Sequence, residues 1–344
     1  MSLIDLCERG LVPDALTRLG IRRLCAERLT AEGGHDVELA DARLRAMLES
    51  LRHSPIAIET AAANEQHYEV PTRFFQLCLG ERLKYSSCFY ASPGSSLDQA
   101  ENAMLEIYGQ RAELQDGQQI LELGCGWGSL TLWMAERFPG ARITAVSNSA
   151  TQRAHIEAAC LRLGIGNVRV LTCDVNQLIL DPDRFDRCVS IEMFEHMRNY
   201  ASLFEKISGW LRADGKMFVH IFCHRHLLYP FETQGDDNWM GRYFFTGGLM
   251  PSADTLLHFQ QHLRLEQRWL LPGTHYRDTA NHWLANHDRN RDEALTELAA
   301  VYGRDQAAIW NQRWRIFWMA CAELFGYDEG RQWLVAHYRF VKSG

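Results

Sequence analysis

Residues 120–128 read I-L-E-L-G-C-G-W-G, and this short stretch is the strongest indication of the fold class. An apolar run with one acid, Glu122, ends in glycines at 124, 126 and 128, and a helical apolar pattern follows. Glycine lets the backbone approach a ligand that a Cβ atom would keep away. We therefore expect a strand, a tight turn and a helix, with a ligand crevice at the carboxyl end of the strand. The glycine spacing is neither the dinucleotide fingerprint nor a phosphate loop.

The flanking sequence alternates between strand and helix patterns. Strands are predicted at 120–123, 142–146, 168–171, 185–191 and 216–221, with helices at 97–108, 129–138, 150–163 and 200–212 between and before them. Such alternation is typical of a doubly wound α/β fold with a mostly parallel sheet. The last apolar run, 333–342, is interpreted as a strand pair that closes the sheet.

The chain is expected to have two parts, and the second contains this α/β core. Residues 1–60 carry amphipathic helical patterns and are expected to form a helical N-terminal cap. Residues 61–344 form the predicted main domain. Within it, about 227–320 is rich in aromatic residues and is expected to be an insert over the predicted ligand site.

Composition narrows the possible classes of protein. The 344 residues are 47% hydrophobic and 23% charged, which suits a globular protein of one large or two modest domains. The net charge of -7 argues against nucleic acid as a partner and against electrostatic attachment to an anionic membrane. No apolar run approaches the roughly 20 residues of a membrane-spanning helix. Ten cysteines without a C-x-x-C pair, and an N-terminus without signal-peptide features, predict a cytoplasmic protein with reduced thiols.

Polar residues at the ends of the next two strands extend the predicted crevice. Asn148 and Gln152 follow the second strand, where their amides could bind ribose hydroxyls in place of the usual acid. Asp174 follows the third strand and could accept a hydrogen bond from an adenine amine. The alternatives are a helix cap at 147–151 and a solvated turn aspartate.

The fourth strand is predicted to carry the chemistry. Glu192 lies at its end, and Glu195 and His196 follow within one turn. Two carboxylates and an imidazole at one strand end are costly unless they are hydrogen-bonded or functional. Neighbouring carboxylates raise one another's pKa toward the range of a general base. The alternative is a capping glutamate and a structural histidine on the following helix.

The motifs together resemble a known family. The E-x-G-x-G turn resembles motif I of the class I S-adenosylmethionine-dependent methyltransferases. The segments Y-S-S-C-F-Y (85–90), S-N-S-A-T-Q (147–152) and M-F-E-H-M (193–197) are similar to the cyclopropane fatty-acid synthase superfamily. Within it, I-E-M-F-E-H-M-R-N-Y, the D-D-N-W-M-G-R-Y-F-F-T-G-G-L-M-P-S run and A-E-L-F-G-Y resemble the coclaurine N-methyltransferase branch. The resemblance covers about residues 60 to 342.

The resemblance implies a class I methyltransferase with a Rossmann-like, mostly parallel seven-stranded sheet, S-adenosylmethionine as cofactor and a small aromatic amine as acceptor. It places the family's E-x-x-E-H group on Glu192, Glu195 and His196, which would bind the amine and remove its proton. The expected cofactor contacts are Ser86, Glu122, Gly124, Gly126, Asn148, Gln152, Asp174, Val175 and Ile191. The expected acceptor contacts are Tyr68, His220, Tyr243, Phe244 and Trp314.

The chain departs from the cyclopropane synthases that hold a bicarbonate ion as their base. Ser87 stands where those enzymes have a cysteine, and Glu192 stands where they have a small residue. A carboxylate at that position would repel bicarbonate. Methyl or methylene transfer to unsaturated phospholipid chains, with membrane contact, is the alternative function. A non-catalytic S-adenosylmethionine-binding protein is the third candidate function, although the glycine turn and the E-x-x-E-H group are both intact.

Two smaller expectations complete the sequence analysis. The run Cys223-His224-Arg225-His226 matches no zinc spacing, so no metal is expected. Cys321 lies in an apolar helix without a basic neighbour and is interpreted as a core residue. A homodimer is possible.

Overall fold

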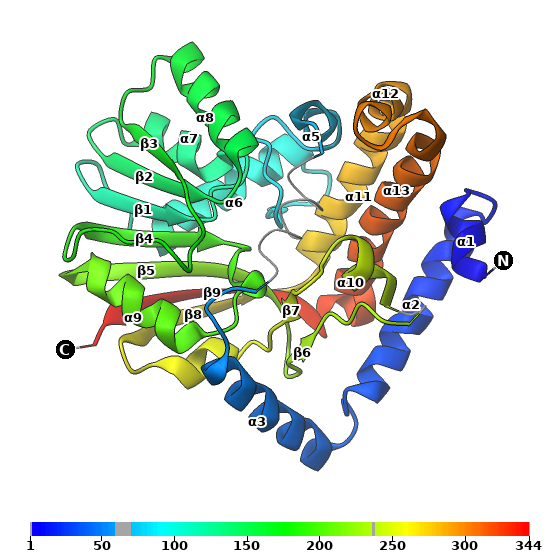
Figure 1. Ribbon diagram of the computed structural model, residues 1–344, viewed down its shortest axis with the longest axis horizontal. Helices are drawn as coiled ribbons and strands as arrows, with labels where there is room; N and C mark the ends of the chain where they lie inside the picture. Colours follow the sequence, from blue (N-terminus) through cyan, green and yellow to red (C-terminus); the bar gives the residue numbers. More distant parts are fainter. Residues whose placement is uncertain (1, 59–69, 236–237, 344) are drawn as a thin grey trace.

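The computed structural model describes residues 2–58, 70–235 and 238–343. Its centre is a seven-stranded sheet with the order β3-β2-β1-β4-β5-β9-β8, in which β9 runs antiparallel to both of its neighbours (Figure 1). The chain turns to opposite sides of β1 to form β2 and β4, which creates the topological switch point where open α/β sheets bind ligands. The strands are β1 (Gln119–Leu123), β2 (Arg142–Ser147), β3 (Val168–Thr172), β4 (Phe185–Ile191), β5 (Leu211–His224), β8 (Leu263–Leu271) and β9 (Trp333–Lys342).

The five predicted strands and the mostly parallel sheet are confirmed. One expectation about the remaining strands is wrong: the run 333–342 is one strand, β9, and its second partner is β8. The aromatic region at about 227–320 includes β8, which belongs to the main sheet, and its place over an acceptor site stays a prediction. β8 escaped prediction because its sequence, L-R-L-E-Q-R-W-L-L, has the mixed polarity of an exposed edge strand.

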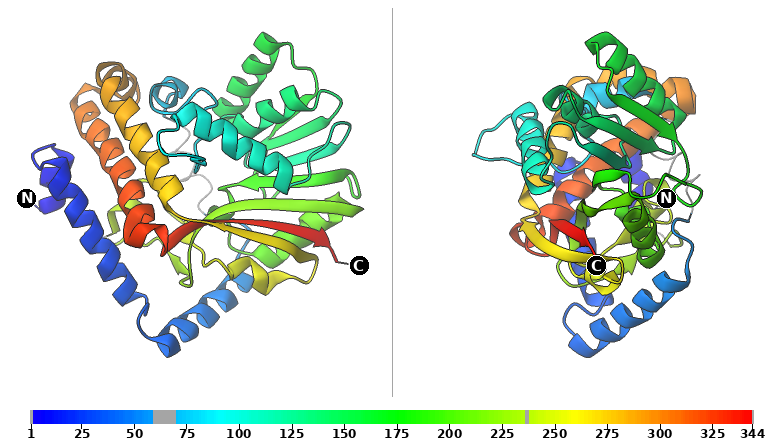
Figure 2. Two further views of the ribbon diagram at one scale, coloured as in Figure 1. Left: turned by 180° about the vertical axis from the view of Figure 1, so that it is seen from behind. Right: turned by 90° about the vertical axis from the view of Figure 1, so that its left-hand side faces the viewer.

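Helices cover both faces of the sheet (Figure 2). On one face, apolar side chains of α6 and α7 pack against β1, β2, β4 and β5, and α8 packs over β2 and β3. On the other face, α9 and the end of α3 pack against β4, β5 and β9. A capping box formed by Ser96 and Gln99 begins α6, and the Asn199 side chain caps α9. These helices are α3 (Val37–His53), α6 (Leu97–Arg111), α7 (Ser129–Arg137), α8 (Ala150–Leu163) and α9 (Tyr200–Trp210).

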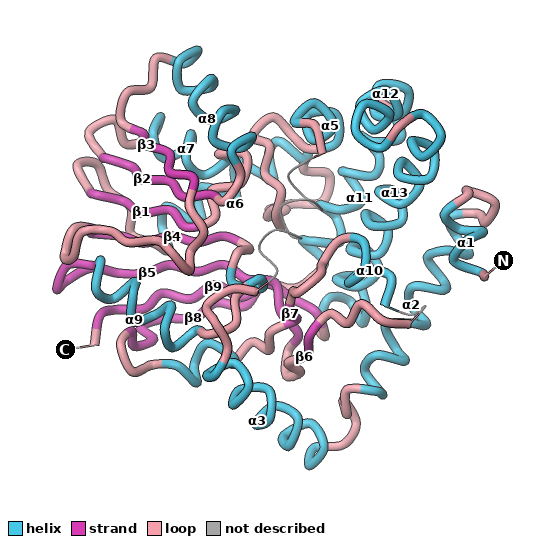
Figure 3. The backbone as a smooth tube through the Cα atoms, viewed as in Figure 1, coloured by secondary structure: helices cyan, strands magenta, loops and turns pink. Residues whose placement is uncertain are grey.

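A helical lobe, distinct from the helices that cover the sheet, lies beside the carboxyl ends of the parallel strands (Figure 3). Its core is aromatic, with Trp314, Trp318 and Phe74 fully buried. Two short strands, β6 (Tyr229–Pro230) and β7 (Leu249–Met250), form a separate pair. The lobe contains α5 (Thr72–Cys78), α10 (Trp239–Tyr243), α11 (Thr274–Arg289), α12 (Arg291–Tyr302) and α13 (Arg304–Gly326), and short 3₁₀ turns elsewhere in the chain are η1 (Phe194–His196), η3 (Thr255–Phe259) and η4 (Tyr327–Gly330).

The N-terminal region is helical, as expected, and connects the two halves of the molecule. It contains α1 (Leu3–Glu8) and α2 (Asp14–Ala31) ahead of α3. The guanidinium groups of Arg18 and Arg22 on α2 both bind the carboxylate of Glu323 on α13, at 2.7 and 2.6 Å. In Figure 1, α2 runs along the helical lobe and α3 returns toward α9. No helix among residues 2–58, 70–235 and 238–343 is long and apolar enough to cross a membrane.

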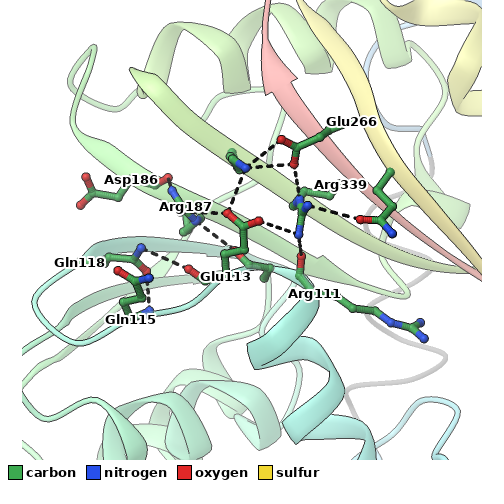
Figure 4. A network of polar contacts seen from close by, with 11 residues as sticks. Arg111, Glu113, Gln115, Gln118, Asp186, Arg187, Glu266 and Arg339 are labelled. Carbon is green, nitrogen blue, oxygen red and sulfur yellow. Dashed lines mark hydrogen bonds and ion pairs between the residues drawn. The ribbon is translucent and has the colours of Figure 1, made fainter.

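A polar network at the amino ends of β4 and β5 ties the chain together away from the strand carboxyl ends (Figure 4). The Glu113 carboxylate lies 2.9 Å from the Arg339 guanidinium and 3.0 Å from the Lys216 ammonium. Lys216 also binds Glu266 of β8 at 2.9 Å. Partly exposed ion pairs of this kind contribute at most about 1 kcal/mol each, so their effect is to hold register.

Candidate active site

The glycine turn after β1 borders a cavity at the strand carboxyl ends. Gly124 and Gly128 have φ values of +80° and +83°, a region that favours glycine. A Cβ atom on Gly124 would lie 2.8 Å from the Met193 side chain, whereas a Cβ on Gly126 would meet no atom within 4 Å. The backbone at Gly126 is therefore open to a ligand, as the sequence predicts.

The cavity collects every residue predicted to contact the cofactor. Its walls come from the loop before α6 and from the ends of β1, β2, β3 and β4. These segments bring together Ser86, Glu122, Gly124, Gly126, Asn148, Gln152, Asp174, Val175 and Ile191. Their binding role remains a prediction.

Buried polar groups in the cavity wall fit a ligand with hydroxyl and ammonium groups. The Gln152 side-chain oxygen accepts from the Ser147 hydroxyl at 2.7 Å, and its Nε2 has no hydrogen-bond partner within the described ranges. The Thr131 hydroxyl donates to Glu122 at 2.5 Å, and burial raises the pKa of Glu122 to about 8. A ribose hydroxyl would satisfy the amide, and an ammonium group would favour the ionised form of Glu122.

Lys84 is a wall residue that the sequence analysis missed. Among the described residues that line the cavity, it is the only lysine or arginine. Its ammonium donates to the Ser86 hydroxyl oxygen and the Ser87 carbonyl oxygen, both at 2.6 Å. Burial lowers its pKa. The signal was its position beside the Y-S-S motif, which a search for acids and glycines passes over. A buried cation here fits the carboxylate of S-adenosylmethionine.

Glu192 stands at the centre of the candidate site, where β4 ends. Its φ of +47° is unusual for a residue with a side chain. Its Oε1 accepts from the Ser87 backbone N–H and from His220 Nε2, each at 2.9 Å. Its Oε2 accepts from the Tyr276 hydroxyl at 2.8 Å. Burial raises the pKa of Glu192 to about 7, and the Lys84 charge opposes that rise.

Tyr276 was also missed by the sequence analysis. It lies on α11, in the helical lobe, far along the chain from β4. Nothing in its local sequence marks it, because only the packing of the lobe against the strand ends brings its hydroxyl to Glu192.

The other two residues of the E-x-x-E-H group lie on different sides of the wall. His196 borders the cavity, and its ring packs against Phe245 with centroids 4.6 Å apart. Glu195 is fully buried behind the wall, where its Oε1 accepts from the Phe222 N–H at 2.6 Å. Burial, followed by the neighbouring Glu192 charge, raises the pKa of Glu195 well above its usual range. The structure therefore brings Glu192 and His196 to the cavity and buries Glu195 behind its wall, and the roles of all three stay predictions.

The predicted acceptor contacts are not gathered at this cavity. Phe244 and Trp314 are fully buried in the lobe core, and their rings pack 5.0 Å apart. The Arg313 guanidinium lies 4.0 Å from the Tyr243 ring centroid and covers that ring. Tyr68 lies outside the described residues. The sequence alone does not distinguish aromatic residues that are buried in a core from those that line a ligand pocket.

His220 contacts Glu192 and does not line the cavity. It is fully buried on β5, and its Nδ1 lies 2.8 Å from the Tyr108 hydroxyl and 3.0 Å from His337 Nε2. His337 Nδ1 in turn lies 2.7 Å from the Arg111 guanidinium. A chain of hydrogen bonds thus runs from Glu192 to the partly buried end of α6.

Comparisons with known proteins show which sequences and folds this chain is similar to. The family model for mycolic acid cyclopropane synthetase matches residues 57–332. The chain is 37% identical to (S)-coclaurine N-methyltransferase from Thalictrum flavum subsp. glaucum, over 100% of this chain and 96% of that protein. A crystal structure of coclaurine N-methyltransferase bound to N-methylheliamine and SAH has a TM-score of 0.95, with 36% identity over 99% of each chain. The cyclopropane synthase MmaA2 from Mycobacterium tuberculosis shares the fold, with a TM-score of 0.70 and 21% identity over 84% of this chain and 100% of that chain.

Proposed function

Since the chain belongs to the mycolic acid cyclopropane synthetase family of S-adenosylmethionine-dependent methyltransferases, we propose that it methylates the nitrogen of a small amine. The observation that carries this proposal is the hydrogen bonding of Glu192. Its Oε1 already accepts two hydrogen bonds, whereas its Oε2 accepts one, from Tyr276. A carboxylate oxygen has two acceptor positions, so Oε2 keeps one for an amine N–H.

The acidity of Glu192 suits this role. A general base works best when its pKa lies near the working pH, and the pKa of Glu192 is about 7. A bound cofactor would supply the methyl group: the amine nitrogen would form the new bond to its carbon, and the sulfur would keep the electron pair of the broken bond. Glu192 takes the proton that the nitrogen releases. His196, with the Phe245 ring packed against it, forms the neighbouring wall, against which an aromatic body of the acceptor would pack.

The other polar residues of the cavity wall are proposed to bind different parts of the cofactor. We assign Lys84 and Ser86 to the cofactor carboxylate, and Glu122 to its ammonium group. Gln152 and Asn148 would bind the ribose, and Asp174 the adenine amine. Positioning of the two reactants would supply most of the rate, with proton removal assisting.

The proposal favours an amine over a phospholipid chain because of how Glu192 is surrounded. The donors from Ser87, His220 and Tyr276 all bind the Glu192 carboxylate, so a free anion has no donors of this set to bind. A carboxylate also repels a second anion. Coclaurine N-methyltransferases act on amines, as their name states, and share the whole length of this chain.

The test is a methyl-transfer assay with labelled S-adenosylmethionine. Cyclic secondary amines with an aromatic ring should be labelled, and vesicles of unsaturated phospholipid should not. Added bicarbonate should leave the amine reaction unchanged. Labelling of phospholipid that bicarbonate stimulates, without labelling of any amine, would overturn the proposal.

A further inference from the structure

We propose that His337, on β9, is a positioning residue that fixes the tautomer of His220 and thereby keeps Glu192 ready to accept a proton. This inference deepens the proposed function and rests on it for its kinetic consequence. His337 and His220 face each other across the antiparallel pair of β9 and β5. Both rings are fully buried, with centroids 4.7 Å apart.

The tautomers follow from the hydrogen-bonding capacity of Arg111. A guanidinium group has donors and no acceptor. Arg111 therefore donates to His337 Nδ1, at 2.7 Å, and this nitrogen carries no proton. In a neutral ring the proton then lies on His337 Nε2, which donates to His220 Nδ1 at 3.0 Å.

The same reasoning fixes the second ring. Because His220 Nδ1 accepts, its proton lies on Nε2, which donates to Glu192 Oε1 at 2.9 Å. The Tyr108 hydroxyl lies 2.8 Å from the same Nδ1, so it and His337 Nε2 share the single lone pair of this nitrogen. Both rings are neutral: burial lowers the pKa of each histidine well below its usual range, and the Lys84 and Arg111 charges act in the same direction.

The tautomer matters because it decides which form of Glu192 is favoured. An N–H that points at Oε1 stabilises the carboxylate, whereas a lone pair there would require a protonated acid. Without the His337 donor, His220 could move its proton to Nδ1 and donate to Tyr108. Glu192 would then be held protonated and could not act as a base.

Other groups also set the charge at this position, and each belongs in the interpretation of a pH profile. They come from the loop before α6 and from five other elements. They are Lys84 and Cys88 of the loop, Tyr108 of α6, Glu195 and His196 of η1, His220 of β5, Tyr276 of α11 and Cys321 of α13.

Two variants test the inference. Arg111→Leu removes the donor that orients His337. Arg111 is the partly exposed last member of the hydrogen-bond chain, so this substitution leaves the buried core unchanged. His337→Gln keeps an acceptor for Arg111 and a donor for His220, and should restore wild-type behaviour. His287→Gln is the matched control, because His287 is equally buried but bonds to Asn311 and Trp318, away from Glu192.

The first measurement does not depend on activity. In protein with ¹⁵N-labelled histidine, long-range NMR should show protonated Nε2 and unprotonated Nδ1 in both His220 and His337. In Arg111→Leu, His220 should show a protonated Nδ1 in part of the population. A protonated Nδ1 on His220 in the unaltered protein would overturn the inference, whether or not the protein methylates amines.

The second measurement is the pH profile of kcat with an amine acceptor. In Arg111→Leu the acid limb should move to higher pH by about one unit, the scale on which one such interaction shifts a pKa. His337→Gln and His287→Gln should keep the wild-type midpoint. A fall in kcat with an unmoved midpoint would show that Arg111 and His337 are only structural. Wild-type tautomers together with no methylation of any amine would instead refute the proposed function.

Discussion

At Glu192, burial and hydrogen bonding oppose each other, and the outcome is a carboxyl group that titrates near neutral pH. Its neighbour Glu195 accepts from the Phe222 N–H behind the cavity wall, and burial raises its pKa well above the usual range, which favours the acid form. The two glutamates of one motif therefore differ in what an amide substitution would change.

Glu192→Gln should lower kcat by roughly 100- to 10,000-fold, the usual contribution of a general base. Glu195→Gln should have a much smaller effect, because glutamine resembles the protonated acid already present. Calorimetry should find S-adenosylhomocysteine affinity near wild type in both variants. Equal losses in the two variants would contradict the separation of their roles, and wild-type turnover in Glu192→Gln would remove the base from the mechanism.

Lys84 offers a test of charge pairing in the cofactor site. Lys84→Met should weaken S-adenosylmethionine binding by roughly 10- to 100-fold, which corresponds to a charge-assisted hydrogen bond of about 1.5–3 kcal/mol. Binding of decarboxylated S-adenosylmethionine should change little, since that ligand has no carboxylate to lose. Titration calorimetry of both ligands against both proteins measures the difference. Parallel losses for the two ligands would show that Lys84 supports the wall and does not bind the carboxylate.

At the scale of elements, the turn between β1 and α7 has two glycines with different constraints. Gly124→Ala would place a Cβ 2.8 Å from Met193 at a φ of +80°. Gly126→Ala would meet no atom within 4 Å in the unliganded protein.

Both substitutions should abolish measurable cofactor binding, but their effects on folding should differ. Gly126→Ala should cost about 1 kcal/mol of unfolding free energy, the cost of a left-handed alanine. Gly124→Ala should cost more, because the clash adds to the backbone strain. Chemical unfolding and calorimetry of both variants test this. Cofactor binding by Gly126→Ala at wild-type affinity would show that the open space beside Gly126 is not the ligand's.

The same elements show how far sequence reasoning reached. Strand ends with Glu122, Asn148 and Asp174 could be ordered from the chain, because parallel strands place their carboxyl ends at one edge. Residues that reach the site from outside that pattern could not. Tyr276 arrives on a helix of the lobe, and nothing in its local sequence marks it.

The predicted acceptor role of the aromatic residues stays a prediction, and their burial could not be read from the sequence for a related reason. Phe244 and Trp314 are residue types that often line ligand pockets, but both are fully buried in the core of the lobe. Periodicity does not separate these two outcomes, since both need apolar faces. β8 was missed because an exposed edge strand lacks the continuous apolar run that marked the buried strands.

At the scale of the whole molecule, buried ionisable groups predict how stability depends on pH. Burial raises the pKa of Glu101 to about 7, of Glu122 to about 8 and of Glu192 to about 7. The folded protein therefore binds more protons than the unfolded chain above about pH 4.5, and stability falls as pH rises toward 8. Buried histidines act oppositely, because burial lowers the pKa of His224 to about 3 and that of His287 to about 4. Below about pH 6.5 the unfolded chain binds more protons at these residues, so their contribution makes stability rise with pH up to that point.

In the window from pH 6.5 to 8 the carboxyl groups outweigh the histidines, because a histidine of the unfolded chain, with an ordinary pKa near 6.5, loses its last protons there. We expect the Tm of the unliganded protein to fall across this window.

An ammonium group bound beside Glu122 favours the ionised carboxylate, so the ligand removes part of the penalty that high pH imposes. Saturating S-adenosylhomocysteine should therefore raise Tm more at pH 8 than at pH 6.5, and binding near pH 7 should release protons from Glu122. Glu122→Gln should lose this pH dependence of the ligand effect together with the proton release, which calorimetry in buffers of different ionisation enthalpy detects. A ligand-induced Tm shift that is constant from pH 6.5 to 8 would place the ammonium group away from Glu122.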